Sequence, residues 1–324
     1  MKKTIILTTM TVLLAASVSP GCSGNNPPNG HRTDGGKPAK VYFTKEISPE
    51  SLIRIYQTLG RKAHGKVAIK LSMGEPGGNN FLKPELIGDF VRLVEGTFID
   101  ANTAYGGNRA TTELHLKAAE DHGFTSVAPV DILDSEGEID LPVVGGKHLT
   151  RDIVGSHFLD YDFVVNLSHF KGHAMGGFGG ALKNMSIGIA SSRGKVLIHS
   201  AGTSTTSWGS PKQDDFLESM AEAAKAIADH CKDNIIYISV MNNLSVDCDC
   251  DSSPADPQMH DVGILASLDP VALDKACVDK VYASEDHGKI HLIERMESRN
   301  GIHVVNYAEL LGLGTTNYEL VSID

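Results

Sequence analysis

The feature that most constrains the fold is a regular alternation of strand-like and helix-like segments in the first half of the chain. The short apolar runs 66–73, 97–102 and 126–133 have the length and composition of buried strands. Between them, 83–96 and 110–124 space their apolar residues as helices do, and each carries a glycine at its end. Strands that alternate with helices in this way form a parallel sheet.

The second half continues the pattern after a predicted hairpin in "EIDLPVVGGKHL". Further elements are expected in this order: strand 161–170, helix 214–233, strand 234–246, strand–loop–helix 262–284 and helix 287–300. In 262–284, Asp269 precedes Pro270 as a helix N-cap, and Asp274 and Asp279 are expected on the solvated surface. The sequence therefore predicts an α/β fold with mainly parallel sheet, flanked by helices, in one large domain or two closely packed subdomains.

The N-terminus has the pattern of an export signal. Two lysines precede an apolar run that is too short to span a bilayer comfortably. Cys22 follows this run and resembles the lipid-attachment cysteine of bacterial lipoproteins. We therefore expect 1–22 to be a signal peptide, 23–40 to be a flexible tether rich in Gly, Pro and Asn, and 41–324 to be the folded domain.

These features predict an exported lipoprotein, on the periplasmic side or at the cell surface, with plain secretion as the alternative. Beyond the signal peptide no stretch of eighteen apolar residues occurs, so membrane contact is expected through the lipid anchor only. The formal net charge of −11 and the lack of a basic stripe exclude a nucleic-acid partner. Export would place the cysteines in an oxidising compartment, where disulfides form.

Four polar loops follow predicted strands: 74–80, 102–109, 168–184 and 247–261. Ligands of α/β sheets bind beyond the carboxyl ends of the strands. We therefore expect these loops to enclose one cleft, and the partner to be a small molecule or a metal. Within them, backbone amides at Gly77, Gly78, Gly106 and Gly107 are candidates to cradle an anion.

Arg109 is the candidate side chain for the charge of that anion. A guanidinium pairs with a carboxylate or phosphate through two parallel hydrogen bonds. A surface salt bridge is the alternative for this residue.

The segment "CDCD" places Cys248 and Cys250 on one side of an extended chain. Thiolates bind soft metals or iron–sulfur clusters, and His260 and Asp261 follow closely enough to complete a site. The alternatives are a local disulfide or free thiols. A metal site here suggests redox chemistry and a redox partner protein. Two further cysteines are expected in the core: Cys231 and Cys277.

Three blocks resemble domain-of-unknown-function family 362: "NTAYGGNRATTELHLKAAEDHGF", "SHFKGHAMGGFGGALKNMSIG" and "CDCD" with "HDVGILASLDPVALDKACVD". The resemblance covers about residues 41–312. Many members of that family carry a ferredoxin-like module or are described as iron–sulfur proteins, so it implies a link to iron–sulfur chemistry. This chain has no Cys-x-x-Cys-x-x-Cys run, and a ferredoxin-type module is absent.

A second, shorter resemblance lies in "HAMGGFGGALK", which is similar to the lactate racemase family with its nickel-pincer nucleotide cofactor. The resemblance implies that His173 transfers a proton, that Lys183 anchors the cofactor and that His199 binds nickel. The chain has no Asp-x-Thr-Arg block like that family's.

Three functions are thus open. The first is a lipoprotein that binds a metal ion, an iron–sulfur cluster or a metal-containing cofactor, with an oxidoreductase-like role. The second is an isomerase that racemises or epimerises a small hydroxy acid. The third is a non-catalytic protein that captures an anionic ligand.

Overall fold

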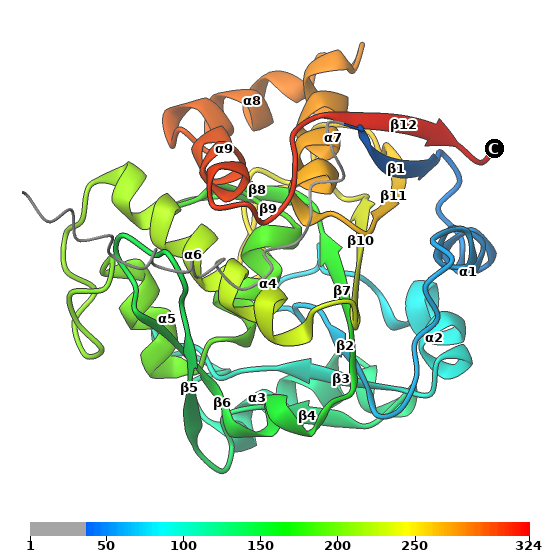
Figure 1. Cartoon of the computed structure of the whole chain (residues 1–324). Helices are drawn as coiled ribbons and strands as arrows, with labels where there is room; N and C mark the ends of the chain where they lie inside the picture. The colour runs from blue at the N-terminus through cyan, green and yellow to red at the C-terminus, as the bar shows by residue number, and fades with distance from the viewer. Residues whose placement is uncertain (1–36) are drawn as a thin grey trace, which may run out of the picture.

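The computed structural model describes residues 37–324 and is built on one eight-stranded sheet (Figure 1). The predicted signal peptide and Cys22 lie outside the described residues. Across the sheet the strands follow this order: β12 (Tyr318–Ser322), β1 (Ala39–Thr44), β11 (Gly263–Ser267), β10 (Ile235–Met241), β7 (Phe163–His169), β2 (Val67–Lys70), β3 (Gly96–Asp100) and β4 (Val130–Ile132).

The sheet is mainly parallel, as the alternation of segments predicts. Strands β10, β7, β2, β3 and β4 run parallel, and so do β12 and β1. The exception is β11, which is antiparallel to both β10 and β1. No helix separates β10 from β11, so the chain turns back directly, and a direct return makes the two strands antiparallel.

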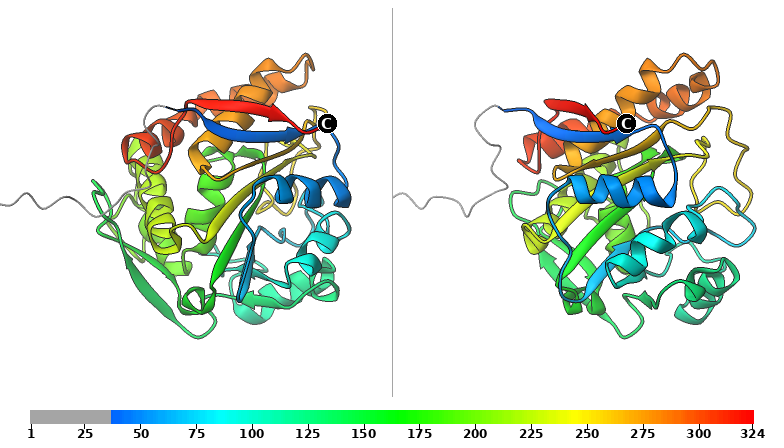
Figure 2. Two further views of the ribbon diagram at one scale, coloured as in Figure 1. Left: turned by 45° about the vertical axis from the view of Figure 1, so that its right-hand side comes forward. Right: turned by 90° about the vertical axis from the view of Figure 1, so that its right-hand side faces the viewer.

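Helices cover both faces of the sheet and bury two apolar cores (Figures 1 and 2). Successive residues of β10 alternate between these cores, because side chains of a strand point to opposite faces. On one face lie α1 (Pro49–Thr58), α2 (Pro84–Leu93) and α3 (Thr112–Asp121). The other core is formed with α4 (Ala181–Ile189), α5 (Ser192–His199), α6 (Gln213–Cys231), α7 (Pro270–Ala283), α8 (Lys289–Ser298) and α9 (Ile302–Leu310).

Two small strand pairs lie outside the main sheet. Strands β5 (Glu138–Pro142) and β6 (Arg151–Gly155) form the predicted antiparallel hairpin. Strands β8 (Lys171–His173) and β9 (Gly177–Gly179) pair within the glycine-rich stretch that leads into α4. Between residues 37 and 324, no helix has the length and apolarity needed to cross a membrane.

Helix α7 confirms part of the sequence analysis and corrects part of it. The side chain of Asp269 caps the helix by accepting from the N–H groups of Val271 and Ala272, each at 2.9 Å. The prediction that Asp274 lies on the solvated surface is wrong, because its side chain is fully buried. Periodicity along α7 does not reveal that α4 packs against it. The core positions predicted for two cysteines are confirmed, since both are buried and free: Cys231 and Cys277.

Candidate functional site

The four loops predicted to share a cleft do enclose one cavity, of about 360 Å³. Glu75 comes from the loop after β2, and Tyr105 from the loop after β3. His173 comes from the glycine-rich stretch after β7, and Cys248 and Cys250 from the loop after β10. Parallel neighbours end at the same edge of a sheet, which is why loops far apart in sequence meet here.

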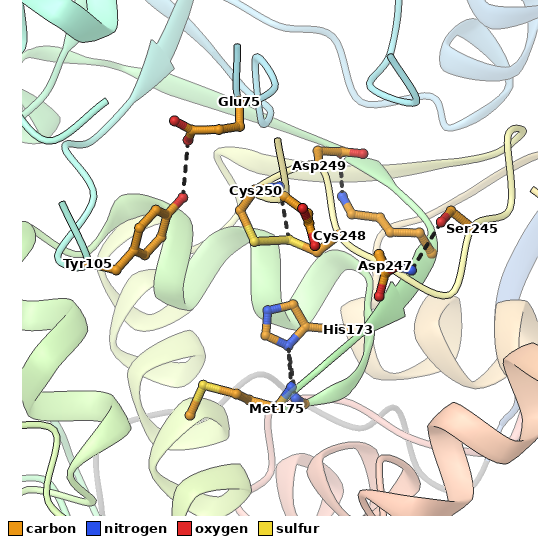
Figure 3. The surroundings of a disulfide bond; sticks show 12 residues. Glu75, Tyr105, His173, Met175, Ser245, Asp247, Cys248, Asp249 and Cys250 are labelled. Carbon is orange, nitrogen blue, oxygen red and sulfur yellow. Dashed lines mark hydrogen bonds and ion pairs between the residues drawn. A yellow bond between two sulfur atoms is a disulfide. The ribbon is translucent and has the colours of Figure 1, made fainter. Parts of the chain in front are cut away.

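Cys248 and Cys250 form a disulfide at the wall of this cavity (Figure 3). Of the alternatives that the sequence left open, the structure therefore shows the disulfide. In this state each sulfur is bonded to the other, and neither is a thiolate ligand. Cys248 is buried, and its Sγ accepts a hydrogen bond from the backbone N–H of Cys250 at 3.1 Å, whereas Cys250 is only partly buried.

The structure does not bring His260 and Asp261 to the cysteine pair. The His260 side chain is 94% exposed, and its Nδ1 lies 2.9 Å from a carboxylate oxygen of Asp286. Asp261 accepts from the backbone N–H of Asn243 at 2.8 Å. The side chain that lies beside the two sulfurs is that of His173. One ring nitrogen of His173 and the two Sγ atoms all lie within 4.8 Å of one another.

The backbone around His173 determines which ring nitrogen carries the proton. Its Nδ1 accepts from the N–H of Gly176 at 2.9 Å and of Met175 at 3.2 Å. Burial, together with the charges of Lys183 and His199, lowers the pKa of His173 well below its ordinary value. The ring is therefore neutral with its proton on Nε2, and it lies between Met175 and the disulfide (Figure 3). A histidine that binds a metal normally donates a hydrogen bond from its other ring nitrogen, whereas Nδ1 of His173 accepts hydrogen bonds.

Asp249, between the two cysteines, holds their loop in place. Its buried carboxylate accepts from Lys171 Nζ at 2.7 Å and from His169 Nδ1 at 2.9 Å. His169 also donates from Nε2 to the carbonyl of Asn242 at 2.6 Å. Burial raises the pKa of Asp249, but the charges of His169 and Lys171 outweigh it and hold the pKa well below its usual range. The sequence does not predict this role for Asp249, although its place in the middle of "CDCD" is a signal.

Arg109 lies inside the protein, where it fits neither of the roles considered for it. Its Nε donates to Glu75 at 2.8 Å, and its Nη1 lies 3.5 Å from Asp100. Asp100 also pairs with Lys70 at 3.2 Å, and all four side chains are buried. The guanidinium of Arg109 already has carboxylate partners, so it is not free to bind a ligand. Its contact with Glu75 positions that side chain in the wall of the cavity.

The glycines of the first two loops also have structural roles. A Cβ on Gly77 would lie 2.8 Å from the carbonyl oxygen of Ser252, and one on Gly78 would lie 2.7 Å from that of Asp251. Both glycines thus allow the loop after β2 to pack on the cysteine loop. In the second loop, two glycines have left-handed backbone conformations, and the second of them lines the cavity: Gly106 and Gly107.

Lys183, on the first turn of α4, is placed by Asp274. The two carboxylate oxygens of Asp274 accept from the N–H of Ala181 at 2.7 Å and of Leu182 at 2.9 Å. A Cβ on Gly180 would lie 2.3 Å from Asp274, so only glycine permits this approach. Burial raises the pKa of Asp274 to about 7, and the two N–H groups oppose that rise.

The amine of Lys183 has no hydrogen-bond or ion-pair partner among residues 37–324. Burial and the nearby charges of Lys171 and Lys70 lower its pKa to about 7. The side chain is partly buried, so the amine is sheltered but reachable. An unpaired amine that is neutral in part at physiological pH is a nucleophile.

His199 completes the group implied by the racemase resemblance. Its Nδ1 donates to the carbonyl of Lys195 at 2.7 Å, which leaves a lone pair on Nε2. Burial lowers the pKa of His199 to about 4, so the ring is neutral at physiological pH. The ring stacks on Phe216 and meets the edge of Trp208. Donation from one nitrogen to a carbonyl, with the other left free, is the arrangement of a metal-binding imidazole.

Comparison with known proteins bears on both resemblances. A family model described as Domain of unknown function (DUF362) matches residues 67–279. The chain belongs to this family. No curated protein matches the chain.

Solved structures similar to this DUF362 protein include the lactate racemase apoprotein from Thermoanaerobacterium thermosaccharolyticum, at 15% identity and a TM-score of 0.44. The match covers 75% of this chain and 57% of the racemase. A protein from Thermotoga maritima matches at 14% identity and a TM-score of 0.45, over 74% of this chain and 59% of that one. The chain thus spans less than two thirds of either neighbour. The shorter resemblance noted in the sequence therefore finds a counterpart, although likeness at this level carries no argument about activity.

The first prediction concerns Asp249. Its pKa in the folded state lies below the unfolded value near 3.9, so its ion pairs stabilise the fold above about pH 4, and this contribution is lost as the pH falls further. Asp249→Asn should lower the free energy of unfolding at pH 7 by about 3–5 kcal/mol, because it leaves buried cations unpaired. Urea denaturation from pH 3 to pH 8 measures the difference in free energy of unfolding between the wild type and Asp249→Asn. This difference should become smaller below pH 4. Asp251→Asn, at an exposed position of the same loop, is the control and should change little.

A second prediction concerns the amine of Lys183. Since its pKa is lowered to about 7, the amine is protonated and unreactive at pH 5 and mostly neutral at pH 8. Brief labelling with an acylating reagent, followed by peptide mass spectrometry, should give a labelling rate for Lys183 with a midpoint near pH 7. Lysines in water react mainly at higher pH, because their ordinary pKa is about 10.4, and exposed lysines are therefore the internal control. Coincident pH profiles would contradict the assignment.

Proposed function

We propose that this chain is an exported, lipid-anchored protein that holds a metal-containing organic cofactor beside the cavity, with Lys183, which does not itself line the cavity, as the covalent anchor. The observation that carries the proposal is the unpaired amine of Lys183, with its pKa near 7. The finer expectation is a nickel-pincer type of cofactor and an isomerase acting on a small hydroxy acid.

Comparison with the neighbouring lysines supports Lys183 as the anchor. Lys70 pairs with Asp100, and Lys171 pairs with Asp249. Lys195 donates to two backbone carbonyls, at 2.6 and 3.3 Å. Of these four lysines only Lys183 keeps an uncommitted amine, and a nucleophile must be uncommitted to attack a ligand.

His199 fits the role of the metal ligand. A metal that is held mainly by its organic cofactor needs only one ligand from the protein. Imidazole nitrogen suits nickel, and the hydrogen bond from Nδ1 to Lys195 orients the ring. When bound, such a cofactor supplies the electron-accepting centre that the side chains of the cavity lack.

His173 fits the role of the proton-transfer residue. Two backbone N–H groups occupy Nδ1, so the Nε2–H group, on the ring edge opposite Met175, is the one that His173 can offer to a ligand (Figure 3). Its pKa is low, so the imidazole is not held permanently as a cation. Tyr105 and Glu75 line the same cavity.

A second function is favoured by the disulfide at the wall of the cavity. A thiolate of a partner dithiol would attack Sγ of Cys250, which is less buried, and Cys248 would leave as a thiolate that accepts from the N–H of Cys250. The partner's second thiol would then release the mixed disulfide, so two electrons pass to the cysteine pair. After reduction, the two sulfurs would offer thiolate ligands to a soft metal ion.

The experiment for the anchor is peptide mass spectrometry on protein isolated from the organism that makes it, with metal analysis on the same sample. We expect the Lys183 peptide to carry an added mass and the protein to hold about one nickel ion per chain. Lys183→Arg should lose both and remain folded, whereas Lys62→Arg, at an exposed lysine, should keep both.

Other outcomes of the same experiment are informative. Protein without adduct or metal, whose Cys248–Cys250 bond is reduced and reformed reversibly by a dithiol buffer, would overturn the cofactor proposal in favour of the redox function. Metal that is bound only by the reduced protein and lost in Cys248→Ser would identify the thiolate site.

The lipid anchor has its own test. If Cys22 is acylated, the protein should sediment with membranes, and Cys22→Ser should move it to the soluble exported fraction. The acyl group on Cys22 is too small a change to alter the fold, so the two proteins should have the same melting temperature. Equal distribution of both proteins between the fractions would exclude the anchor.

A further inference from the structure

A second polar cluster, apart from the cavity, is formed by His148, Asp215, Glu218 and His303. His148 lies on the loop between β5 and β6, Asp215 and Glu218 lie on α6, and His303 lies on α9. His148 Nε2 is 2.7 Å from one carboxylate oxygen of Glu218, and His303 Nε2 is 3.1 Å from the other. None of the four residues lines the cavity at the cysteine pair.

We propose that this cluster is a binding site for a divalent metal ion of the zinc type. Ligand atoms of His148, Asp215 and Glu218 all lie within 4.8 Å of one another, and His303 approaches Glu218 from a different helix. Two imidazole nitrogens with carboxylate oxygens form a donor set that Zn²⁺ accepts in tetrahedral geometry. Loss of the imidazole protons on binding would replace two N–H···O contacts with metal bonds.

The frame of this site is rigid before any ion binds. Glu222, one turn after Glu218, accepts from the backbone N–H groups of Lys147, His148 and Leu149 at 2.7 to 3.2 Å. It also accepts from the hydroxyl of Tyr307 on α9 at 2.9 Å. One buried carboxylate therefore holds both the His148 loop and α9 against α6, so only the side chains of the cluster would have to turn to take a metal ion.

Charge and access are also suitable. The carboxylate of Glu218 accepts hydrogen bonds from Lys147, His148 and His303, so it is already a site where cations gather. The side chains of His148 and His303 are 12% and 27% exposed, so an ion can reach them. The ammonium group of Lys147 lies 2.8 Å from a carboxylate oxygen of Glu218. Its side chain is 60% exposed, so the ammonium group can move into solvent when an ion binds.

The test is titration of the untagged full chain, with its disulfide intact, with Zn²⁺ alone by calorimetry. We expect one ion per chain at this site and a rise in the melting temperature, because binding links three elements of the fold. His148→Gln and His303→Gln should each weaken binding by more than about 100-fold, the upper end of what loss of an outer-shell partner costs. Co²⁺ in place of Zn²⁺ should give visible d–d bands without a sulfur charge-transfer band.

Two controls separate this site from others on the protein. His260→Gln removes an exposed imidazole beside Asp286 and should leave the affinity unchanged. The double variant Cys248→Ser, Cys250→Ser should also bind normally. Absence of Zn²⁺ binding in the wild type, equal binding in His148→Gln and the wild type, or loss of binding in the double serine variant would each overturn the proposal. Thermal denaturation of each variant without metal shows whether it is folded.

Discussion

The carboxylate of Asp249 is shared between Lys171 and His169, and the geometry of the site depends on this buried interaction. A buried charge without partners costs several kcal/mol, so the three groups must stay together once they leave water. Because Asp249 separates Cys248 from Cys250, the same contact fixes both sulfurs against the glycine-rich stretch. The position of the disulfide at the cavity wall is therefore a consequence of charge compensation behind it.

The glycines of that stretch make room for other buried ionisable side chains. Gly180 leaves room for the carboxylate of Asp274, which caps α4 from a position 93 residues further along the chain. A Cβ on Gly188 would lie 2.4 Å from Cε of Lys70, so this glycine makes room for a buried lysine. Ionisable side chains and glycines occur together here because side chains with charged ends need close backbone contacts when they are buried.

Much of the site could be predicted from the order of elements, because parallel strands bring their following loops to one edge. The four loops follow from this order. His173 and Lys183 are instead implied by the resemblance to the lactate racemase family, and the cysteine pair is indicated by the "CDCD" segment. The partners of ionisable groups could not be predicted. Arg109 pairs with Glu75, 34 residues away, and His260 with Asp286, because these contacts depend on distances through space that no local pattern records.

By itself the sequence determined the alternation of strands and helices, the parallel sheet that follows from it and the edge at which the polar loops gather. These properties are local, since hydrophobic periodicity and connection length act over one or two elements at a time. The tertiary structure alone decided that Cys248 and Cys250 are joined, that Asp274 is buried and that Lys183 is left without a partner. The reason for this division is that the surroundings of a buried ionisable group come from segments that only the complete fold brings near.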